Sequence, residues 1–367
     1  MKINIERNIG KGVLTKLLPI FTKKFLSELP NTPQNLLKYA KRRVSPFISP
    51  YIGKSLRIKM LESRMTDEEY LFSFYHAVHM HFYKIEREEK PVSSIILSQT
   101  GAGKSELAKL IINERKNSVI INTDLYKKFN PKIDKIFMED PNHLGELTAI
   151  DSYDLANNIK EFAIQNKYDL IFELAPCKNE IIGIDTKTLN DKGYNIRYYI
   201  LAVGDLISSL SIHSRYEKKI KEDNHMLLKL TNLNRHDESY RQLLKIIKIL
   251  PVDKTNIYRR GTEKEGFVPQ LLNKNQKNSL QSLYSSFIFE RERSNKIYIF
   301  GQGTNKNFLR DYYRIKSSMI IRNAPETQFI QLKNIYEKYV RYMNFLGFHI
   351  NKKVKDKRKK NKFEKRS

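Results

Sequence analysis

The sequence predicts an α/β protein built on a parallel sheet that is flanked by helices. Short apolar runs alternate with amphipathic stretches of helical length from about residue 93 to residue 221, a pattern typical of parallel sheets covered on both faces. A glycine-rich loop at residues 98–105 separates the first apolar run from a helical stretch. Strongly basic segments lie toward both ends of the chain, where we expect helical extensions.

The first predicted helix begins at a capping-box pattern, Thr66-Asp-Glu-Glu69, and extends to about residue 86. It contains His76, His79 and His81. Residues at i and i+3 share a helix face, but the residue at i+5 lies elsewhere, so the three imidazoles would not converge on one metal ion. We therefore expect packed or exposed histidines here.

Four continuous apolar runs predict the strands of the sheet, because each has strand length and is bounded by polar or turn residues. The predicted strands are 93–97, 119–122, 170–174 and 197–203. Helices are predicted at 104–114, 152–166, 186–192 and 206–221. Ligands of such sheets bind at the carboxyl ends of the strands, so the residues that follow each strand are the candidates for function.

The loop "SQTGAGKS" at residues 98–105 has the pattern of a phosphate-binding P-loop, with Ser98 at the position where glycine is usual. Its glycines allow backbone N–H groups to turn toward phosphate oxygens, Lys104 would reach the β- and γ-phosphates, and the Ser105 hydroxyl would bind Mg²⁺. The later glycines and the lysine make the anion site, so Ser98 mainly shapes the strand exit. ATP and Mg²⁺ are the expected cofactors. The expected nucleotide-binding residues are Gly101, Ala102, Gly103, Lys104, Ser105 and Glu106.

Two carboxylates follow the next predicted strands. Asp124 lies just past the second strand; where that strand neighbours the P-loop strand, Asp124 faces the γ-phosphate and can accept a proton from an attacking hydroxyl. An aspartate that caps the next helix is the alternative. Glu173 ends the third strand, where it either orients Mg²⁺ and substrate or lies at an exposed sheet edge. Arg215 and Arg235 would neutralise the transferring phosphoryl group, or else are ordinary surface residues.

The net charge of +27 is concentrated toward the ends of the 367-residue chain. Residues 1–64 contain 14 Lys and Arg against 3 Asp and Glu, and residues 352–367 contain 10 against 2. Such segments attract nucleic acid, an anionic membrane or an acidic protein, unless they are simply solvated tails. No apolar stretch reaches the roughly 18 residues of a transmembrane segment. The single cysteine, Cys177, excludes an internal disulfide and fits the cytoplasm.

Taken together, these segments resemble the zeta toxin family, P-loop kinases of bacterial toxin–antitoxin systems. The resemblance includes "SQTGAGKSEL", "INTDLYKKFNP", "YDLIFE", "LAVGDLISSLSIHSRYE", "NRHDESY" and "NIYRRG", which occur in the family's order between about residues 65 and 295. The spacing from Asp124 to Pro131 matches the family's D-x-F-K-x-x-H-P. We therefore expect a P-loop kinase domain at 65–295, a basic and mostly helical extension at 1–64, and a C-terminal extension at 296–367. The last part holds a strand-like "KIYIF" at 296–300, a helix at 328–345 and the basic tail.

The resemblance implies a role for each candidate. Lys104 and Ser105 would serve ATP and Mg²⁺, Asp124 would activate the acceptor hydroxyl, and Glu173 would lie in the substrate and metal region. Arg215 and Arg235 would bind phosphate. The implied reaction is phosphorylation of a nucleotide sugar, typically UDP-N-acetylglucosamine at its 3′-hydroxyl, which depletes a cell-wall precursor. The implied partner is an acidic helical antitoxin, and the site of action is the cytoplasm, including that of another cell if the chain is a delivered effector.

Three positions depart from the family pattern. The family's strand-end Glu is usually followed by Gly-Thr-x-Arg, whereas Glu173 is followed by Leu-Ala-Pro-Cys177, so an arginine that contacts substrate is missing. Asn130 replaces the family's His, and Ser98 replaces the first P-loop glycine. We therefore expect ATP binding to be kept, and the identity of the acceptor stays open.

Two other functions stay open as well. A P-loop kinase or NTPase that acts on nucleic acid would explain the basic ends, because cations that neutralise phosphates give strong salt-dependent binding. The sequence contains no aromatic RNA-binding signature that would favour it. A catalytically weakened protein that keeps a nucleotide pocket for interaction is the third alternative.

Overall fold

The structure is a computed structural model, and it describes residues 6–8, 36–43, 52–140, 143–176, 186–222, 230–262, 265–272, 279–301 and 307–348. Cys177, the basic tail at 352–367 and much of the basic segment at 1–64 lie outside the described residues. Within the described part, no helix combines the length and the apolar character that a membrane span needs.

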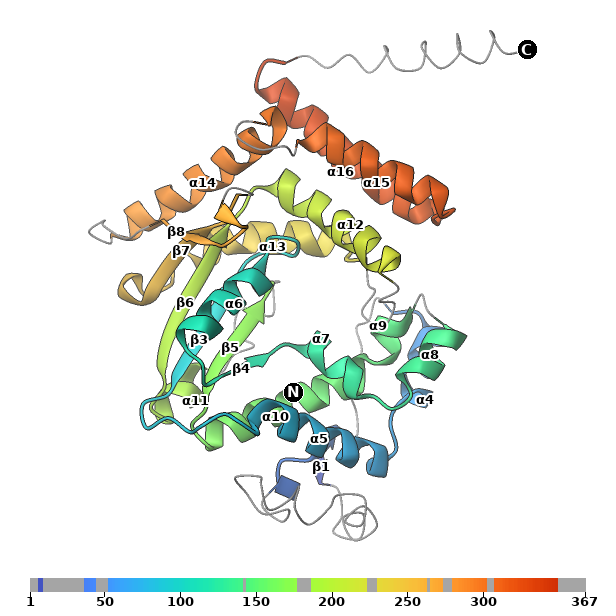
Figure 1. Ribbon diagram of the computed structural model, residues 1–367, viewed down its shortest axis with the longest axis vertical. Helices are drawn as coiled ribbons and strands as arrows, with labels where there is room; N and C mark the ends of the chain where they lie inside the picture. The colour runs from blue at the N-terminus through green and yellow to red at the C-terminus, as the bar shows by residue number, and fades with distance from the viewer. Residues whose placement is uncertain are drawn as a thin grey trace.

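A six-stranded sheet forms the centre of the molecule, in the order β4-β5-β3-β6-β7-β8 (Figure 1). The first five strands along this order are parallel, and the edge strand β8 is antiparallel to β7. The sheet with its flanking helices confirms the predicted α/β fold class. The strands are β3 (Val92–Leu97), β4 (Ser118–Ile121), β5 (Asp169–Leu174), β6 (Asn195–Ala202), β7 (Thr255–Arg259) and β8 (Gln270–Leu271).

Strand β4 is not a neighbour of the P-loop strand. The role considered for Asp124 depends on β4 lying beside the P-loop strand β3, but β5 lies between them and pairs with both. The physical reason is burial: β5 is six residues long with four consecutive buried residues, which suits an interior strand, whereas β4 has four residues and ends the sheet. Glu173 is consequently the carboxylate at the end of the strand next to the loop.

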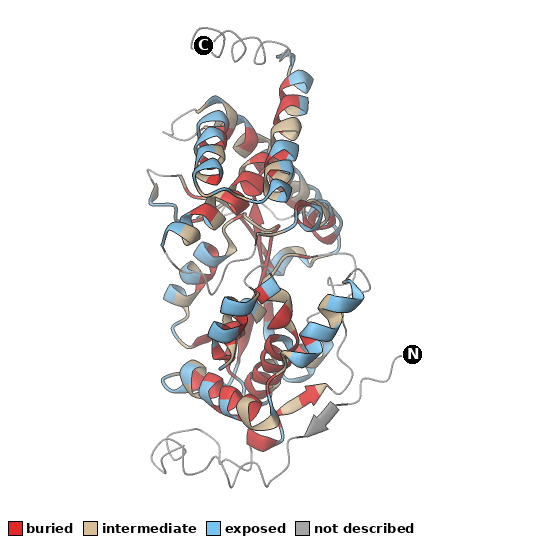
Figure 2. Cartoon of the chain, turned by 90° about the vertical axis from the view of Figure 1, so that its right-hand side faces the viewer, coloured by how far each residue is buried: buried red, intermediate tan, exposed pale blue. Residues whose placement is uncertain are grey.

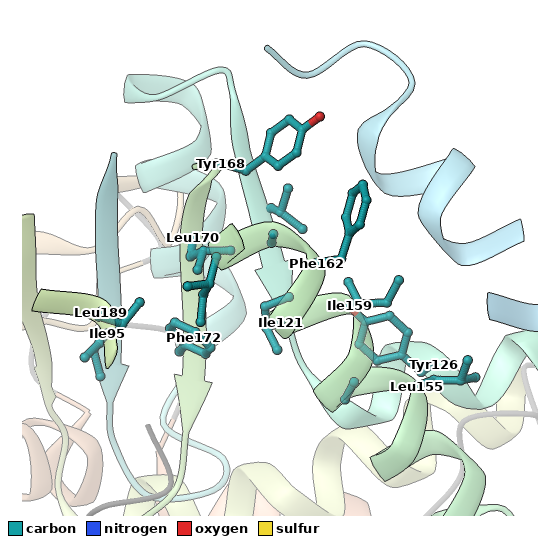
Figure 3. Close-up of a cluster of buried hydrophobic side chains, with 14 of the residues drawn as sticks. Ile95, Ile121, Tyr126, Leu155, Ile159, Phe162, Tyr168, Leu170, Phe172 and Leu189 are labelled. Atoms are coloured by element: carbon teal, nitrogen blue, oxygen red, sulfur yellow. The ribbon is translucent and has the colours of Figure 1, made fainter. Parts of the chain in front are cut away.

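Alternate residues of β3 face opposite sides of the sheet, as the strand geometry requires. Ile95 and Leu97 belong to the main hydrophobic cluster, which includes residues of α5 (Asp67–Phe82) and α10 (Ala149–Gln165). Figure 3 shows the part of this cluster where α10 packs against β4 and β5. Ile96 instead packs with α6 (Lys104–Glu114) on the other face. Strand β3 is therefore buried from both sides, and buried residues fill the interior of the molecule (Figure 2).

Helix α5 begins as predicted: the Thr66 hydroxyl accepts from the N–H of Glu69, and the Glu69 carboxylate accepts from the N–H of Thr66. It ends at Phe82. His76 packs edge-on against Phe129 at 5.2 Å between ring centroids, and His81 lies 5.4 Å from Tyr126. These two histidines therefore pack against aromatic side chains.

The remaining helices connect the strands or cover the ends of the sheet. They are α4 (Lys54–Glu62), α7 (Thr123–Tyr126), α8 (Ile133–Glu139), α9 (Leu144–Leu147), α11 (Thr186–Asp191), α12 (Asp205–Lys221), α13 (Leu233–Ile246), α14 (Leu280–Phe300), α15 (Phe308–Ile321) and α16 (Glu326–Phe345). A short antiparallel pair, β1 (Glu6–Asn8) with β2 (Lys41–Arg43), lies outside the main sheet.

The described part of the N-terminal segment packs into the main core. Leu36 and Ala40 are fully buried in the same cluster as the sheet residues. The buried Arg42 donates to Asp67 at 2.7 Å and to Asp151 at 3.1 Å, which ties β2 to α5 and α10. Residues 36–43 are therefore integrated with the sheet layer in the structure.

Helices α14, α15 and α16 gather around α12 at one end of the molecule (Figure 1). The strand predicted at 296–300 is wrong, because these residues form the last turns of α14. Tertiary contacts override the local β-propensity: Tyr298 packs against Phe308 and its hydroxyl donates to Asp311 of α15 at 2.8 Å. The predicted boundary at residue 295 also falls inside α14.

Candidate nucleotide-binding and phosphoryl-transfer site

The glycine-rich loop connects β3 to α6, as predicted. Gly101 and Gly103 adopt positive φ angles of 80° and 103°, and Gly103 caps the N-terminus of α6 in the left-handed conformation. A β-carbon on Gly101 would lie 2.1 Å from the backbone oxygen of Ser208 in α12, so no other residue fits without a backbone shift. The loop is thus folded tightly against α12, with the N-terminal end of α6 at its base.

Lys104 folds back over the loop from the first turn of α6. Its Nζ donates to the backbone oxygens of Ser98 and Gln99, each at 3.1 Å. Burial, together with the charges of Arg215 and Arg235, lowers the pKa of Lys104 to about 8, while the carboxylate of Glu173 works against this shift. The ammonium is therefore held inside the loop, where an incoming anion would stabilise its charged form.

Ser105 and Glu173 meet at the edge of the sheet, because β5 is adjacent to β3. The Ser105 hydroxyl donates to Glu173 Oε2 at 3.3 Å, and Asn122 Nδ2 donates to the same oxygen at 3.2 Å. Burial raises the pKa of Glu173, and the neighbouring Lys104 works against that rise. A hydroxyl and a carboxylate side by side are oxygen ligands of the kind that Mg²⁺ prefers, so this pair fits the expected metal.

Asp124 lies in the first turn of α7. The capping residue is its neighbour Asn122, whose Oδ1 accepts from the N–H of Asp124 at 3.0 Å, so the interpretation of Asp124 as the helix cap is wrong. The Asp124 carboxylate accepts from Lys127 Nζ at 2.6 Å and is 73% exposed. The aspartate is therefore both paired with a cation and open to a ligand from solution.

The two predicted arginines come from consecutive helices, Arg215 from α12 and Arg235 from α13. Both are exposed, and both act electrostatically on Lys104. Lys219, one helical turn after Arg215, has its pKa lowered by burial and then by Arg215, while Asp124 opposes the shift. Helix α12 thus spans from the loop to Asp124, and the arginines, Lys104 and Glu173 form one electrostatic group.

Two predicted positions have mainly local contacts. The Glu106 carboxylate pairs with Lys109 at 2.9 Å on the exposed face of α6, so only its backbone belongs to the helix N-terminus. Asn130, which stands where the resembled family has His, accepts from the N–H of Lys132 at 2.9 Å and forms a local turn.

Sequence reasoning missed four side chains that hold the site: Gln99, Asn122, Lys127 and Lys219. The spacing of Lys127 three residues after Asp124 on a predicted turn is a signal that could have found that pair. The positions of the other three side chains depend on the strand order and on the packing of α12 against the loop. No local sequence pattern predicts either of these features.

The chain resembles known proteins along the segment that carries these residues. A sequence model of the family described as Zeta toxin matches residues 79–268. Toxin zeta of Streptococcus pyogenes is 26% identical over 176 residues, which cover 47% of this chain and 58% of that protein. Toxin zeta of Enterococcus hirae is 25% identical over 175 residues, with the same coverage of 47% and 58%. The match therefore spans less than two thirds of the length of these curated relatives.

Among solved structures, one from the PezAT chromosomal toxin–antitoxin system of Streptococcus pneumoniae aligns with 64% of this chain and 98% of that chain. Its sequence identity is 18% and its TM-score is 0.49. The match to the family model covers more than half of the chain and includes the loop, Glu173, both arginines and Asp124. The chain belongs to the zeta toxin family.

Proposed function

We propose that the chain is an ATP-dependent phosphotransferase of the zeta toxin type, which phosphorylates a hydroxyl of a nucleotide sugar similar to UDP-N-acetylglucosamine. The observation that carries this proposal is the meeting of Lys104, Ser105 and Glu173 at the end of the P-loop strand. A cation, a hydroxyl and a carboxylate are the groups that a triphosphate with Mg²⁺ requires.

In this mechanism each residue has a separate task. The loop N–H groups and Lys104 bind the β- and γ-phosphates, and Ser105 with Glu173 would hold Mg²⁺, which neutralises phosphate charge when bound. The Asp124 carboxylate takes the proton of the acceptor hydroxyl as its oxygen bonds to the γ-phosphorus. The bond from that phosphorus to the bridging oxygen of ADP breaks, and Arg215 and Arg235 stabilise the charge that spreads over the phosphoryl oxygens.

The surroundings of Asp124 support an acceptor that itself carries phosphate. Lys127 pairs with Asp124, and Lys219 interacts electrostatically with both Asp124 and Arg215. A diphosphate in the acceptor would be attracted to these cations, as the diphosphate of a nucleotide sugar is. RNA shares this property, so the acceptor has to be identified by experiment.

The test incubates the purified protein with ATP and Mg²⁺ and offers UDP-N-acetylglucosamine, RNA or no acceptor. We expect a phosphorylated nucleotide sugar, whose formation Lys104→Ala and Asp124→Asn both abolish. Asp124→Asn should leave ATP binding intact, and Asp134→Asn, at an exposed aspartate in the first turn of α8, serves as the matched control. Phosphorylated RNA with unchanged nucleotide sugar would overturn the proposed acceptor, and ATP binding without any product would favour an interaction protein.

The toxic role and the partner belong to the same proposal. Expression of the wild-type chain should arrest growth, and expression of Asp124→Asn should not. The exposed cations near the loop and Asp124 favour an acidic antitoxin, whose co-expression should restore growth. Growth arrest by Asp124→Asn equal to that of the wild type would separate toxicity from phosphoryl transfer.

A further inference from the structure

A chain of polar side chains, fully buried at Gln99, Ser208 and His236 and partly buried beyond them, leads away from the phosphate-binding loop. It begins at Gln99, the second residue of the loop, whose side chain is completely buried. Gln99 Nε2 donates to the backbone oxygen of Val203 at 2.8 Å and to the Ser208 hydroxyl at 3.1 Å. The backbone oxygen of Gln99 accepts from Lys104 Nζ, so any shift of Gln99 is passed to the phosphate-binding lysine.

The chain continues from α12 into α13. The Ser208 hydroxyl and His236 Nε2 share a hydrogen bond of 2.8 Å, and His236 Nδ1 lies 2.8 Å from Asp237 Oδ1. His236 is completely buried, and both of its ring nitrogens are engaged. The imidazole is thus fixed in position between the serine that contacts Gln99 and an aspartate of its own helix.

The far end of the chain is Lys338 in α16. Its Nζ donates to Asp205 Oδ1 at 3.2 Å and also to Asp237 Oδ1. Asp205, His236 and Asp237 lie close enough to hold a metal ion together. The Lys338 ammonium already lies between the two carboxylates, where a bound cation would lie. We therefore infer that Lys338, and not a metal ion, neutralises the charge of these carboxylates.

Helix α14 holds the same region from a second side. Arg291 stacks on Tyr240, with its guanidinium carbon 3.4 Å from the ring centroid, and its Nη2 lies 3.5 Å from Gln99 Oε1. Ser294 and Asn295 accept the backbone N–H groups of Gly204 and Leu206 at 2.8 and 3.1 Å, which fixes the start of α12.

We propose that Lys338, Asp237, His236 and Ser208 are positioning residues that fix Gln99 and thereby set the geometry of the phosphate-binding loop. Lys338 lies well outside residues 79–268, so a helix beyond the segment matched by the family model would determine how well the loop binds phosphate. This inference rests on the proposed function in one respect, namely that the loop binds ATP.

The test compares two substitutions in the same helix. Lys338→Met removes the ammonium and keeps the length of the side chain. Lys333→Met makes the same change at an exposed lysine that pairs with Glu337, one turn away at 4.0 Å. ATP affinity with Mg²⁺ is measured with a fluorescent ATP analogue, and thermal stability is measured in parallel. We expect Lys338→Met to raise the Kd for ATP by about three- to tenfold, since it removes charge-assisted hydrogen bonds at the end of the chain. Lys333→Met should leave the Kd unchanged.

A purely structural role for α16 is tested separately. Ile335→Val loosens the buried face of α16 without touching the polar chain, so it should lower the Tm and leave the Kd unchanged. Lys338→Arg keeps the charge and should restore most of the affinity. Ser208→Ala breaks the chain at its centre, so adding Lys338→Met to it should weaken binding no further.

Each outcome decides between named alternatives. Wild-type affinity in Lys338→Met, or fully additive effects of Lys338→Met and Ser208→Ala, would overturn the positioning role alone. A loss of affinity in Ile335→Val equal to that in Lys338→Met would attribute the effect to helix packing and overturn it too. A wild-type protein that binds no ATP would overturn the proposed function, and the positioning role with it.

Discussion

Raising the pH from 7 to 9 should weaken ATP binding, because it removes the charge of Lys104. Burial, reinforced by Arg215 and Arg235, lowers the pKa of this lysine to about 8, against an ordinary value of 10.5. With that pKa, about nine tenths of the lysines are charged at pH 7 and about one tenth at pH 9. The free protein therefore loses its phosphate-binding charge within an accessible pH range.

The direction of this change in ATP affinity follows from proton linkage. A bound triphosphate favours the charged lysine and raises its pKa, so above pH 8 the complex holds more protons than the free protein. The Kd for ATP should then increase about tenfold per pH unit until the pKa of the complex is reached. Stability changes in the opposite sense: an unfolded lysine keeps its proton up to about pH 10.5, so the contribution of Lys104 to stability rises with pH between 8 and 10.5.

Calorimetry measures this proton uptake directly. ATP is titrated at pH 8.5 in two buffers with different heats of protonation, and the difference between the observed heats gives the number of protons taken up. The phosphates of ATP contribute little, because their last pKa is about 6. Lys104→Arg should abolish the uptake, whereas Lys219→Arg should keep it, although the pKa of Lys219 is lowered too. A Kd that stays constant between pH 7.5 and 9.5 would refute the assigned environment of Lys104.

Two further substitutions test the framework of the site. Gly101→Ala places a β-carbon 2.1 Å from the backbone oxygen of Ser208, so it should abolish ATP binding in a nucleotide titration. Gly193→Ala has the same φ of 80° with open space around it, so it should cost only about 1–2 kcal/mol of stability and keep ATP affinity; equal effects would contradict the steric explanation. Arg42→Met removes the nearer cation of the buried Asp151 and leaves Arg64 Nε 3.6 Å away, so it should lower the free energy of unfolding by about 3 kcal/mol in denaturant titrations. Adding Asp151→Asn should recover part of that loss, and a change below about 1 kcal/mol would show that the pair is dispensable.

The sequence predicted the central strands well because each is a continuous apolar run with polar ends. The observed bounds of β3, β4, β5 and β6 differ from the predicted ones by at most two residues at either end. Helix α14 could not be predicted in the same way, because its buried face is not a continuous apolar pattern. Its buried face includes Glu290, Arg291 and Asn295, whose burial depends on partners elsewhere in the fold, so its hydropathy pattern does not identify the inner face.

Only those parts of the candidate site whose residues are adjacent in sequence could be predicted. The loop was recognisable because the glycines, Lys104 and Ser105 are adjacent in sequence. The contact of Ser105 with Glu173 depends on which strand lies beside β3, and that order is set by the crossover connections rather than by any single segment. For the same reason, the sequence could not decide whether the strand before Asp124 lies beside the P-loop strand.

Ser98 is the departure from the P-loop pattern that the structure explains most fully. It has no positive φ angle, so a glycine is not needed for the backbone at this position. Its side chain is buried, and its hydroxyl donates to the backbone oxygen of Leu201 in β6 at 3.0 Å. Its own backbone oxygen accepts from Lys104. A glycine here would lose the bond to β6, so Ser98 fixes the start of the loop from one side as Gln99 is fixed from the other. The loop in this chain is therefore held by side chains at its first two positions, and glycine is required only at Gly101 and Gly103, where the backbone turns.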